Sequence, residues 1–390
     1  MTPSGRIVGW HHTPFGKHEE DVEALAVRAV RGALADAGVD AAEVDAIFVG
    51  HFNEGFCPQG FPGSLALQAD DGLRFTPTTR VENACATGSA AVHQGLQAIE
   101  AGTADTVLVV GFEKMSAVSG REVGEILLRA SYVKEEAEIP GGFAGVFGRI
   151  AGLYFERFGD QSDALAQIAA KGHRNGAKNP LAHFRKEFSF EFCREPSDKN
   201  PRVAGPLKRT DCSPVSDGAA ALVLRSPQAA SGHERQVAFR AAVHVQDFLP
   251  MSRRDIVLFE GCREAWQQAH AEAGTTLDDL SLVETHDCFT IAELIEMEAM
   301  GLAPLGEAAA LVAEGQTEIG GRLPINPSGG LKAKGHPIGA TGVSMHIMAA
   351  MQLCGMAGEL QVEGPQLAGV FNMGGAAVAN YTSILERVGG

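Results

Sequence analysis

The sequence predicts an α/β protein built from two related halves, and two repeated patterns carry this prediction. The tripeptide Ala-Thr-Gly occurs at 86–88 and at 340–342, each time opening an Ala-rich apolar helix. An Ala-rich helix, a Gly at its end, a short turn and a strand are expected at 33–49 and again at 269–285. The two patterns follow one another in the same order in both halves, which points to a duplication.

A third repeat supplies the strands that follow these helices. The apolar segments 107–112 (VLVVGF) and 367–372 (LAGVFN) both have the composition of buried strands. Strands that alternate with helices predict sheets whose strands run parallel. We therefore expect two α/β sheets with parallel strands, one in each half.

The repeats divide the 390 residues into segments. We expect the first half at 1–113, an inserted loop domain at 114–205, the end of the first half at 206–230 and the second half at 231–390. The insertion belongs to neither repeat, and insertions on a rigid scaffold commonly carry substrate contacts.

Composition and charge exclude several classes of function. The net charge of −16 argues against nucleic acid as the main partner, and no apolar run approaches the length of a membrane span. Seven cysteines without CxxC pairs argue against a disulfide framework and against a structural zinc site. The N-terminus has no apolar signal region, so we expect a protein of the reducing cytoplasm.

Cys85 lies where a predicted strand meets a predicted helix. A thiol at a helix N-terminus is exposed to the positive end of the helix dipole, so we expect a lowered pKa and a reactive thiolate. The N–H groups of that turn could also stabilise an oxyanion. The alternative is a small cysteine in the core.

The second Ala-Thr-Gly motif is preceded by a glycine-rich run, 326–342, that contains His336. Such a run lets the backbone approach a ligand closely, and Ser328 and Gly329 are therefore candidate substrate-binding residues. Pro337 biases His336 away from helical conformation. The result is a fixed imidazole that can serve as a base or as an oxyanion donor. A cysteine and a histidine from related halves indicate acyl transfer.

A third cluster, His286-Asp287-Cys288, ends the predicted strand of the second repeat. Titratable side chains at the end of a strand in an α/β sheet point to the ligand-binding edge. Metal binding is the competing interpretation. Its weakness is that no third and fourth ligands stand at zinc-like spacing, so we expect no metal.

The segment 160–210 is basic although the whole chain is acidic. It holds ten Lys and Arg against six Asp and Glu, which suits a small polyanionic ligand. The alternative is an ordinary solvated surface. The candidates for binding the ligand are Lys171, Arg174, Lys178, Arg185 and Lys186.

These motifs together resemble the thiolase family. The run Cys-Ala-Thr-Gly-Ser at Cys85 looks like the nucleophile loop of that family, and Gly-His-Pro at His336 looks like its signature histidine motif. Most thiolases carry Asn-Glu-Ala-Phe where this chain has 286–289, and Cys-x-Gly where it has 372–374. Both departures resemble the sterol-carrier-protein type of thiolase.

The resemblance implies a fold and a set of roles. The fold would have five layers, αβαβα, from two duplicated halves with the inserted loop domain. Cys85 would be the nucleophile, His336 would promote its thiolate, and Cys288 would take over acid/base chemistry. His286 and His336 would polarise the thioester oxygen. The backbone N–H groups of Cys85 and Gly374 would form a second oxyanion site.

The resemblance also implies the substrates and the assembly. The expected reaction is thiolysis of a 3-ketoacyl-CoA or the reverse Claisen condensation, with coenzyme A as co-substrate, its phosphates on the basic segment, and no bound cofactor. A homodimer or a dimer of dimers is expected. One rival is an acyltransferase or retro-aldolase subunit that needs a zinc-ribbon/OB-fold companion protein. A more remote rival is a non-catalytic scaffold that binds CoA.

Overall fold

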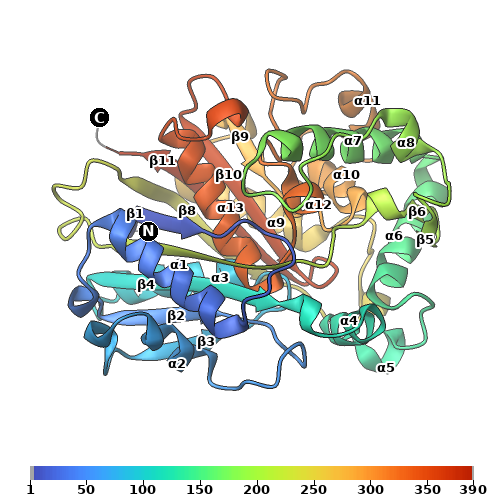
Figure 1. Ribbon diagram of the computed structural model, residues 1–390. Coiled ribbons are helices and arrows are strands. Elements are labelled where there is room, and N and C mark those ends of the chain that lie inside the picture. Colours follow the sequence, from blue (N-terminus) through green and yellow to red (C-terminus); the bar gives the residue numbers. More distant parts are fainter. Residues whose placement is uncertain (1–3, 389–390) are drawn as a thin grey trace.

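The computed structural model describes residues 4–388 (Figure 1). The first half contributes five helices and strands before the turn that carries Cys85 and three after it. They are β1 (Arg6–His12), α1 (Val22–Ala37), β2 (Ala46–Gly50), α2 (Pro62–Ala66), β3 (Thr78–Val81), α3 (Thr87–Glu100), β4 (Thr106–Lys114) and β7 (Asp217–Arg225).

The second half repeats this arrangement with additional helices. It contains β8 (Val237–Gln246), α9 (Glu260–Ala273), β9 (Leu282–Glu284), α10 (Thr290–Ala299), α11 (Ala308–Ala313), α12 (Gly330–Lys334), α13 (Ile338–Leu353), β10 (Leu367–Gly374) and β11 (Ala379–Arg387). The predicted repeat is present: α1 and α9 both end at a glycine in the left-handed conformation, Gly38 with φ 63° and Gly274 with φ 65°. The helix pair α3 and α13 and the strand pair β4 and β10 correspond in the same way.

The strands form one continuous order, β3-β2-β4-β7-β1-β8-β11-β10-β9, in which β1 and β8 join the two halves through a short contact. The prediction of parallel strands is only partly right. The pairs β2–β3, β2–β4 and β9–β10 are parallel, whereas β4–β7, β1–β7, β8–β11 and β10–β11 are antiparallel. For β10 and β11 the reason is local, because a four-residue turn between them forces a hairpin.

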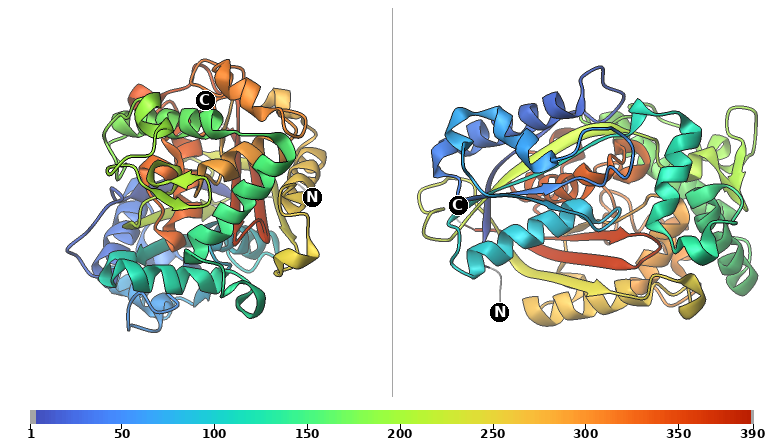
Figure 2. Two further views of the ribbon diagram at one scale, coloured as in Figure 1. Left: turned by 90° about the vertical axis from the view of Figure 1, so that its right-hand side faces the viewer. Right: turned by 90° about the horizontal axis from the view of Figure 1, so that it is seen from below.

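Five layers result from this order. Figure 2 shows α3 and α13 between the strands of the two halves, with α1 outside one set of strands and α9 outside the other. Nearly every residue of α13 is buried, as expected for a helix with a sheet on either side. The expected αβαβα architecture is confirmed.

The first turns of α3 and α13 touch through glycines. A Cβ placed on Gly342 would lie 2.1 Å from the backbone nitrogen of Ser89, and one placed on Gly88 would lie 2.7 Å from the nitrogen of Gly342. Only glycine permits backbones to come this close. The two Ala-Thr-Gly motifs are therefore the contact that brings the preceding residues of both halves together.

The insertion covers one end of the molecule, at the right of Figure 1. Its elements are α4 (Gly120–Leu127), α5 (Val133–Glu136), α6 (Gly142–Phe158), α7 (Ser162–Lys178), α8 (Phe190–Arg194) and β5 (Arg202–Ala204), which pairs with β6 (Leu207–Lys208). The predicted boundaries of the four segments stay a prediction. Within residues 4–388, every helix is too short or too polar to cross a bilayer.

Gly342→Ala should destabilise the protein, because the new methyl group meets backbone that cannot move aside. Overpacking a well-packed interior costs about 1–3 kcal/mol, and we expect a loss at or above the upper end in urea unfolding. Gly152→Ala in α6 is the matched control, because its Cβ would meet nothing within 4 Å. In a helix this change should be neutral or add up to about 1 kcal/mol. Equal effects of the two substitutions would contradict the glycine contact.

Candidate active site

Cys85 lies on a tight turn between β3 and α3. Ala84 has a positive φ of 49°, which is uncommon for a residue with a side chain and marks local strain. The turn is held by Thr87, whose hydroxyl donates to the Ala84 carbonyl at 2.6 Å and accepts the Asn83 N–H at 2.9 Å. The thiol is buried, with 3% of the residue exposed. The strained turn at Ala84 and the hydrogen bonds of Thr87 therefore fix the direction of the Cys85 side chain.

The ring of His336 is oriented by Thr341, one turn into α13. The Thr341 hydroxyl donates to the Pro337 carbonyl at 3.0 Å, so it must accept from Nδ1 of His336, which lies 2.7 Å away. The proton of the neutral ring is thus on Nδ1, and Nε2 carries a lone pair. This buried Nε2 has no hydrogen-bond partner among residues 4–388. His336 presents a base.

His286 is oriented in the opposite sense by Asn372 of β10. The Asn372 amide donates to the Cys85 carbonyl at 3.2 Å and to Nδ1 of His286 at 2.8 Å. Because Nδ1 accepts, the proton of the neutral ring is on Nε2. That Nε2 is also buried and without a partner in the described part of the chain. His286 presents a donor.

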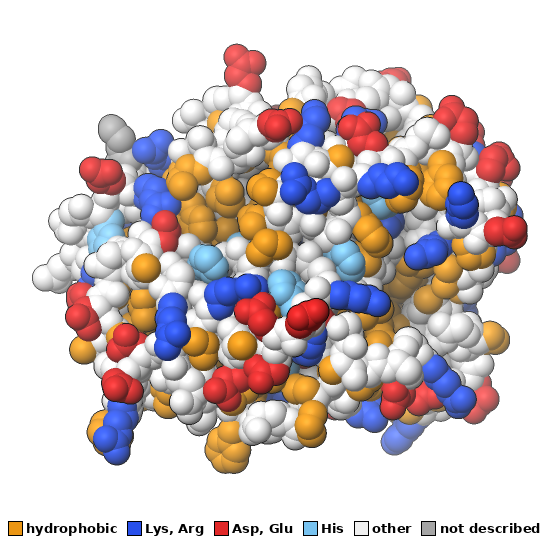
Figure 3. All heavy atoms as spheres, viewed as in Figure 1, with side chains coloured by type: hydrophobic (Ala, Val, Ile, Leu, Met, Phe, Trp, Pro, Cys, Tyr) orange, Lys and Arg blue, Asp and Glu red, His pale blue; other side chains and the backbone are white. Residues whose placement is uncertain are grey.

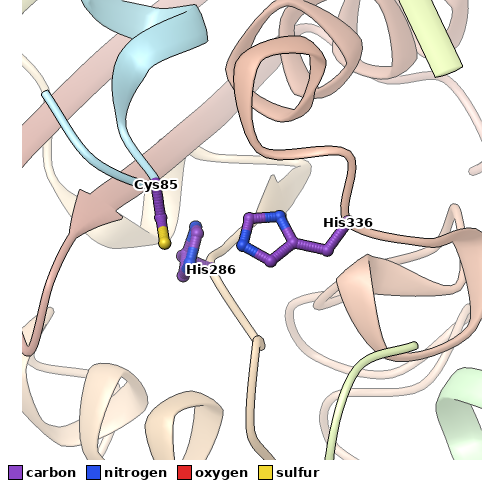
Figure 4. Close-up of side chains that lie close together, drawn as sticks. All are labelled: Cys85, His286 and His336. Carbon is purple, nitrogen blue, oxygen red and sulfur yellow. The ribbon is translucent and has the colours of Figure 1, made fainter. Parts of the chain in front are cut away.

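Three segments thus converge on one point (Figure 4). Sγ of Cys85 and one ring nitrogen each of His286 and His336 all lie within 4.8 Å of one another. The two rings meet edge to face, with centroids 5.1 Å apart. The three side chains that the sequence motifs singled out are therefore brought together, with one ring able to accept a proton and the other able to donate one.

Both imidazoles are neutral. Burial, and to a lesser extent the nearby Lys334 ammonium, lowers the pKa of His336 to about 3. Burial also lowers the pKa of His286 well below its ordinary value, with His336 as a lesser cause. The hydrogen-bond assignments above therefore describe the state of the rings at neutral pH.

The expectation of a resting thiolate at Cys85 is wrong. Burial raises the pKa of the thiol to about 12, and the carboxylates of Glu82 and Glu113 act in the same direction. A hydrogen bond from the Gly375 N–H lowers the pKa but does not offset the burial. The helix dipole is also displaced, since α3 begins at Thr87 and not at the cysteine. The free protein holds a thiol.

Cys288 follows β9 in the same buried region as Cys85. Burial raises the pKa of Cys288 well above its ordinary value, and Cys85 raises it further, which places the two thiols within electrostatic reach. Its backbone carbonyl accepts the Ser213 N–H at 2.9 Å. Cys288 stands outside the group formed by Cys85 and the two histidines.

The backbone donor beside Cys85 is displaced by one residue from the prediction. Gly374 is the last residue of β10 and pairs with Ala379, whereas the N–H of Gly375 reaches the Cys85 thiol. Gly375 has a φ of 63°, and the left-handed turn aims its N–H at the sulfur. The only signal in the sequence was the Gly-Gly pair itself.

The five basic candidates do not form one surface. Lys171 is 1% exposed and pairs with the buried Glu293 at 2.5 Å, so its selection as a phosphate ligand is wrong. Arg174 pairs with Glu318 at 2.5 Å, and Lys186 lies over the ring of Phe188, 5.6 Å from its centre.

Lys178 and Arg185 lie together at a cavity of about 360 Å³ whose walls include methionines of α13. Both are exposed, and neither is in an ion pair with another described residue. Figure 3 shows basic side chains next to hydrophobic ones on this face of the molecule.

Ser328 and Gly329 support the glycine-rich run from within. The Ser328 hydroxyl donates to Glu284 at 2.6 Å, and its N–H donates to the same carboxylate at 3.0 Å. Gly329 has a φ of 99°, and a Cβ there would lie 2.8 Å from the backbone of Gly176 in α7. Both residues are thus engaged in packing α7 against the segment that leads to His336.

Two buried carboxylates tie the site segments together: Asp287, which the sequence placed in the cluster at the ligand-binding edge, and Glu113, which no motif singled out. Asp287 accepts the N–H groups of Leu331 at 2.6 Å and of Lys332 at 3.3 Å, which fixes α12 immediately before His336. Glu113, at the end of β4, accepts the N–H of Gly339 at 3.1 Å just after it. The position of His336 is therefore set from both sides.

The comparisons with known proteins agree with this architecture. Residues 6–228 match the family described as "Thiolase, N-terminal domain", and residues 243–387 match "Thiolase C-terminal domain-like". An acetyl-CoA acetyltransferase of Methanothermobacter thermautotrophicus is 34% identical over 385 residues, which cover 98% of this chain and 99% of that protein. Sterol carrier protein 2 of Homo sapiens is 34% identical over 94% of this chain and 68% of its own length.

Solved structures show the same fold. One titled "Ltp2-ChsH2(DUF35) aldolase" superimposes with a TM-score of 0.83 at 23% identity, covering 99% of this chain and 98% of that one. The acetyl-CoA acetyltransferase of Syntrophomonas wolfei gives a TM-score of 0.73 at 18% identity, covering 99% of both chains. With a family match over more than half of its length and full-length relatives at 34% identity, the chain belongs to the thiolase family.

Proposed function

We propose that this thiolase-family acyltransferase cleaves 3-ketoacyl-CoA thioesters with coenzyme A, or runs the reverse Claisen condensation. One observation carries the proposal: a buried thiol stands beside two neutral imidazoles that carry their protons on opposite nitrogens. Thiolysis needs a base to remove the proton of the nucleophile and a donor where enolate charge develops. The two rings supply one of each.

In the first step, Cys85 attacks the 3-keto carbon while its proton passes to Nε2 of His336. Because the thiol has a raised pKa, proton transfer accompanies the attack and does not precede it. The C2–C3 bond then breaks, leaving an acyl-enzyme and an acetyl-CoA enolate. Nε2–H of His286 stabilises the enolate oxygen, and His336, now protonated, becomes a second donor.

Cys288 completes the cleavage by protonating the enolate carbon. Its raised pKa keeps it in the thiol form, as an acid must be before it gives up its proton. The N–H groups of Cys85 and Gly375 serve as the oxyanion site for the tetrahedral intermediate, with Gly375 in place of Gly374. The thiol of coenzyme A then attacks the acyl-enzyme and passes its proton to the Cys288 thiolate. Cys85 leaves as a thiolate and takes back the proton held by His336, which completes a ping-pong cycle.

Coenzyme A is the co-substrate, and no bound cofactor takes part. Its phosphates are proposed to meet Lys178 and Arg185, the exposed basic candidates that line the cavity beside α13. The proposed assembly is a homodimer or a dimer of dimers in the cytoplasm. The edge strand β3, which pairs on one side only within the described chain, offers its free side to a second copy.

A second function is favoured by the aldolase complex among the structural neighbours. In this alternative the chain is an acyltransferase or retro-aldolase subunit that works with a companion protein. Turnover of acetoacetyl-CoA and CoA by the purified chain alone separates the two proposals, because the partner-dependent subunit would be inactive without its companion.

Cys85→Ala should abolish the acyl-enzyme. Intact-mass spectrometry after mixing with an acyl-CoA should show one added acyl group on the native protein and none on the variant. Cys57→Ala is the matched control, because Cys57 is a partly exposed free thiol outside the site and its loss should leave acylation unchanged. An acyl group retained by the Cys85 variant would contradict the nucleophile.

The alkylation of Cys85 should depend steeply on pH. Only the thiolate reacts, and burial raises the pKa of this thiol to about 12. The rate constant with iodoacetamide, followed at Cys85 by peptide mass spectrometry, should therefore still be rising at about pH 10, where an ordinary thiol has levelled off. A plateau below neutral pH would show that the resting thiolate exists after all.

Cys288→Ala should separate acylation from carbon–carbon chemistry. The variant should still accept an acyl group on Cys85, but exchange of the acetyl-CoA methyl protons with deuterated water should slow by about 10²–10⁴. Cys288→Ser provides a near-isosteric comparison. Exchange at the native rate in the alanine variant would exclude Cys288 as the acid/base.

A further inference from the structure

We propose that Cys85, His286 and His336 also form a zinc-binding site, which switches the enzyme off reversibly. The ligand set is one thiolate and two imidazoles, a combination that zinc favours. Sequence spacing could not reveal it, because the fold supplies the second and third ligands from residues 201 and 251 positions apart from Cys85. Inhibition by zinc rests on the proposed function, whereas binding of the metal does not.

The geometry requires little change. The three ligand atoms lie within 4.8 Å of one another. A tetrahedral zinc with bonds of about 2.3 Å to sulfur and 2.0–2.1 Å to nitrogen places its ligands roughly 3.3–3.6 Å apart. The ligand atoms therefore have to close by at most about 1.2–1.5 Å, which small rotations of three side chains can share. No hydrogen bond of either Nε2 has to break, since both atoms are buried and have no partner among residues 4–388.

Protons must leave two positions when the metal binds. The Cys85 thiol releases its proton to solvent and binds as thiolate. His336 already presents a lone pair at Nε2, but His286 carries its proton there and must move it to Nδ1. Zinc thus displaces one proton to solvent, and binding tightens as the pH rises.

Asn372 lowers the affinity of the site for zinc. Its amide donates to Nδ1 of His286 at 2.8 Å, so a proton at Nδ1 would place two donors face to face. Relief requires the amide to turn its oxygen, which has no partner in the described structure, toward the ring, and this gives up the contact with the Cys85 carbonyl. Zinc binding is therefore weakened, and the metal can be withdrawn by a chelator.

The inference is tested with cobalt(II), a spectroscopic substitute for zinc, on the metal-free protein without coenzyme A. We expect one equivalent to produce the absorption of tetrahedral cobalt with a thiolate-to-cobalt band. The band should vanish in Cys85→Ser and persist in Cys288→Ser, whose thiol lies outside the group of three. Absence of the band in the native protein, or its persistence in Cys85→Ser, overturns the site.

Asn372→Asp tests the restraint. A carboxylate accepts a hydrogen bond from Nδ1–H and completes a carboxylate–histidine–zinc arrangement, and such partners typically change metal affinity by about 10–100-fold. We expect at least tenfold tighter binding of zinc, measured by competition with a chromogenic chelator, in a variant that keeps its native circular dichroism. Unchanged or weaker binding in the folded variant overturns the role of Asn372.

Activity is measured separately. Zinc should inhibit acyl-enzyme formation in the native protein, and a chelator should restore it. If the cobalt band depends on Cys85 but no acyl-enzyme forms in metal-free protein, the proposed function fails and the metal site stands. If acylation proceeds and zinc at saturating occupancy leaves it unchanged, the regulatory role is overturned.

Discussion

The contact between the first turns of α3 and α13 is the constraint on which the site depends. Gly88 and Gly342 let the two backbones approach closer than any side chain would allow. Each helix begins just after a catalytic residue, so the approach of the helices is also the approach of Cys85 and His336. Carboxylates at Asp287 and Glu113 then hold the connecting segments against this central pair. Close packing at the two glycines brings the catalytic residues together, and buried hydrogen bonds fix their positions.

Within that frame, two neutral side chains decide what each imidazole can do. Thr341 hydrogen-bonds to Nδ1 of His336, and Asn372 hydrogen-bonds to Nδ1 of His286. These two bonds place the ring proton on Nδ1 in His336 and on Nε2 in His286. A pair of identical rings thereby becomes a base and a donor while both rings stay neutral. Burial would penalise a charged ring strongly, so polarising the site through hydrogen bonds is the arrangement that the interior tolerates.

The sequence predicted the parts of this structure that local patterns encode. Ala-Thr-Gly, the glycine ends of α1 and α9, and the reactive residues Cys85, His286 and His336 were all visible in short motifs. What it missed depends on partners far along the chain. Lys171 is basic in sequence but is paired with Glu293, 122 positions away. The local dipole at Cys85 suggested a thiolate, whereas burial by the whole fold reverses the pKa shift. Asn372 was visible only as a missing cysteine.

The division of the site between two halves has a consequence for the protein while it is being made. Cys85 leaves the ribosome roughly 250 residues before His336, a delay on the order of 10–50 seconds at common rates of synthesis. During that interval Cys85 has its apolar neighbours from residues 52–126 but neither imidazole of the second half. Docking of the second half therefore delivers the base and the donor in one event. Until then the thiol has no group to take its proton, and acyl transfer can begin only once the fold is complete.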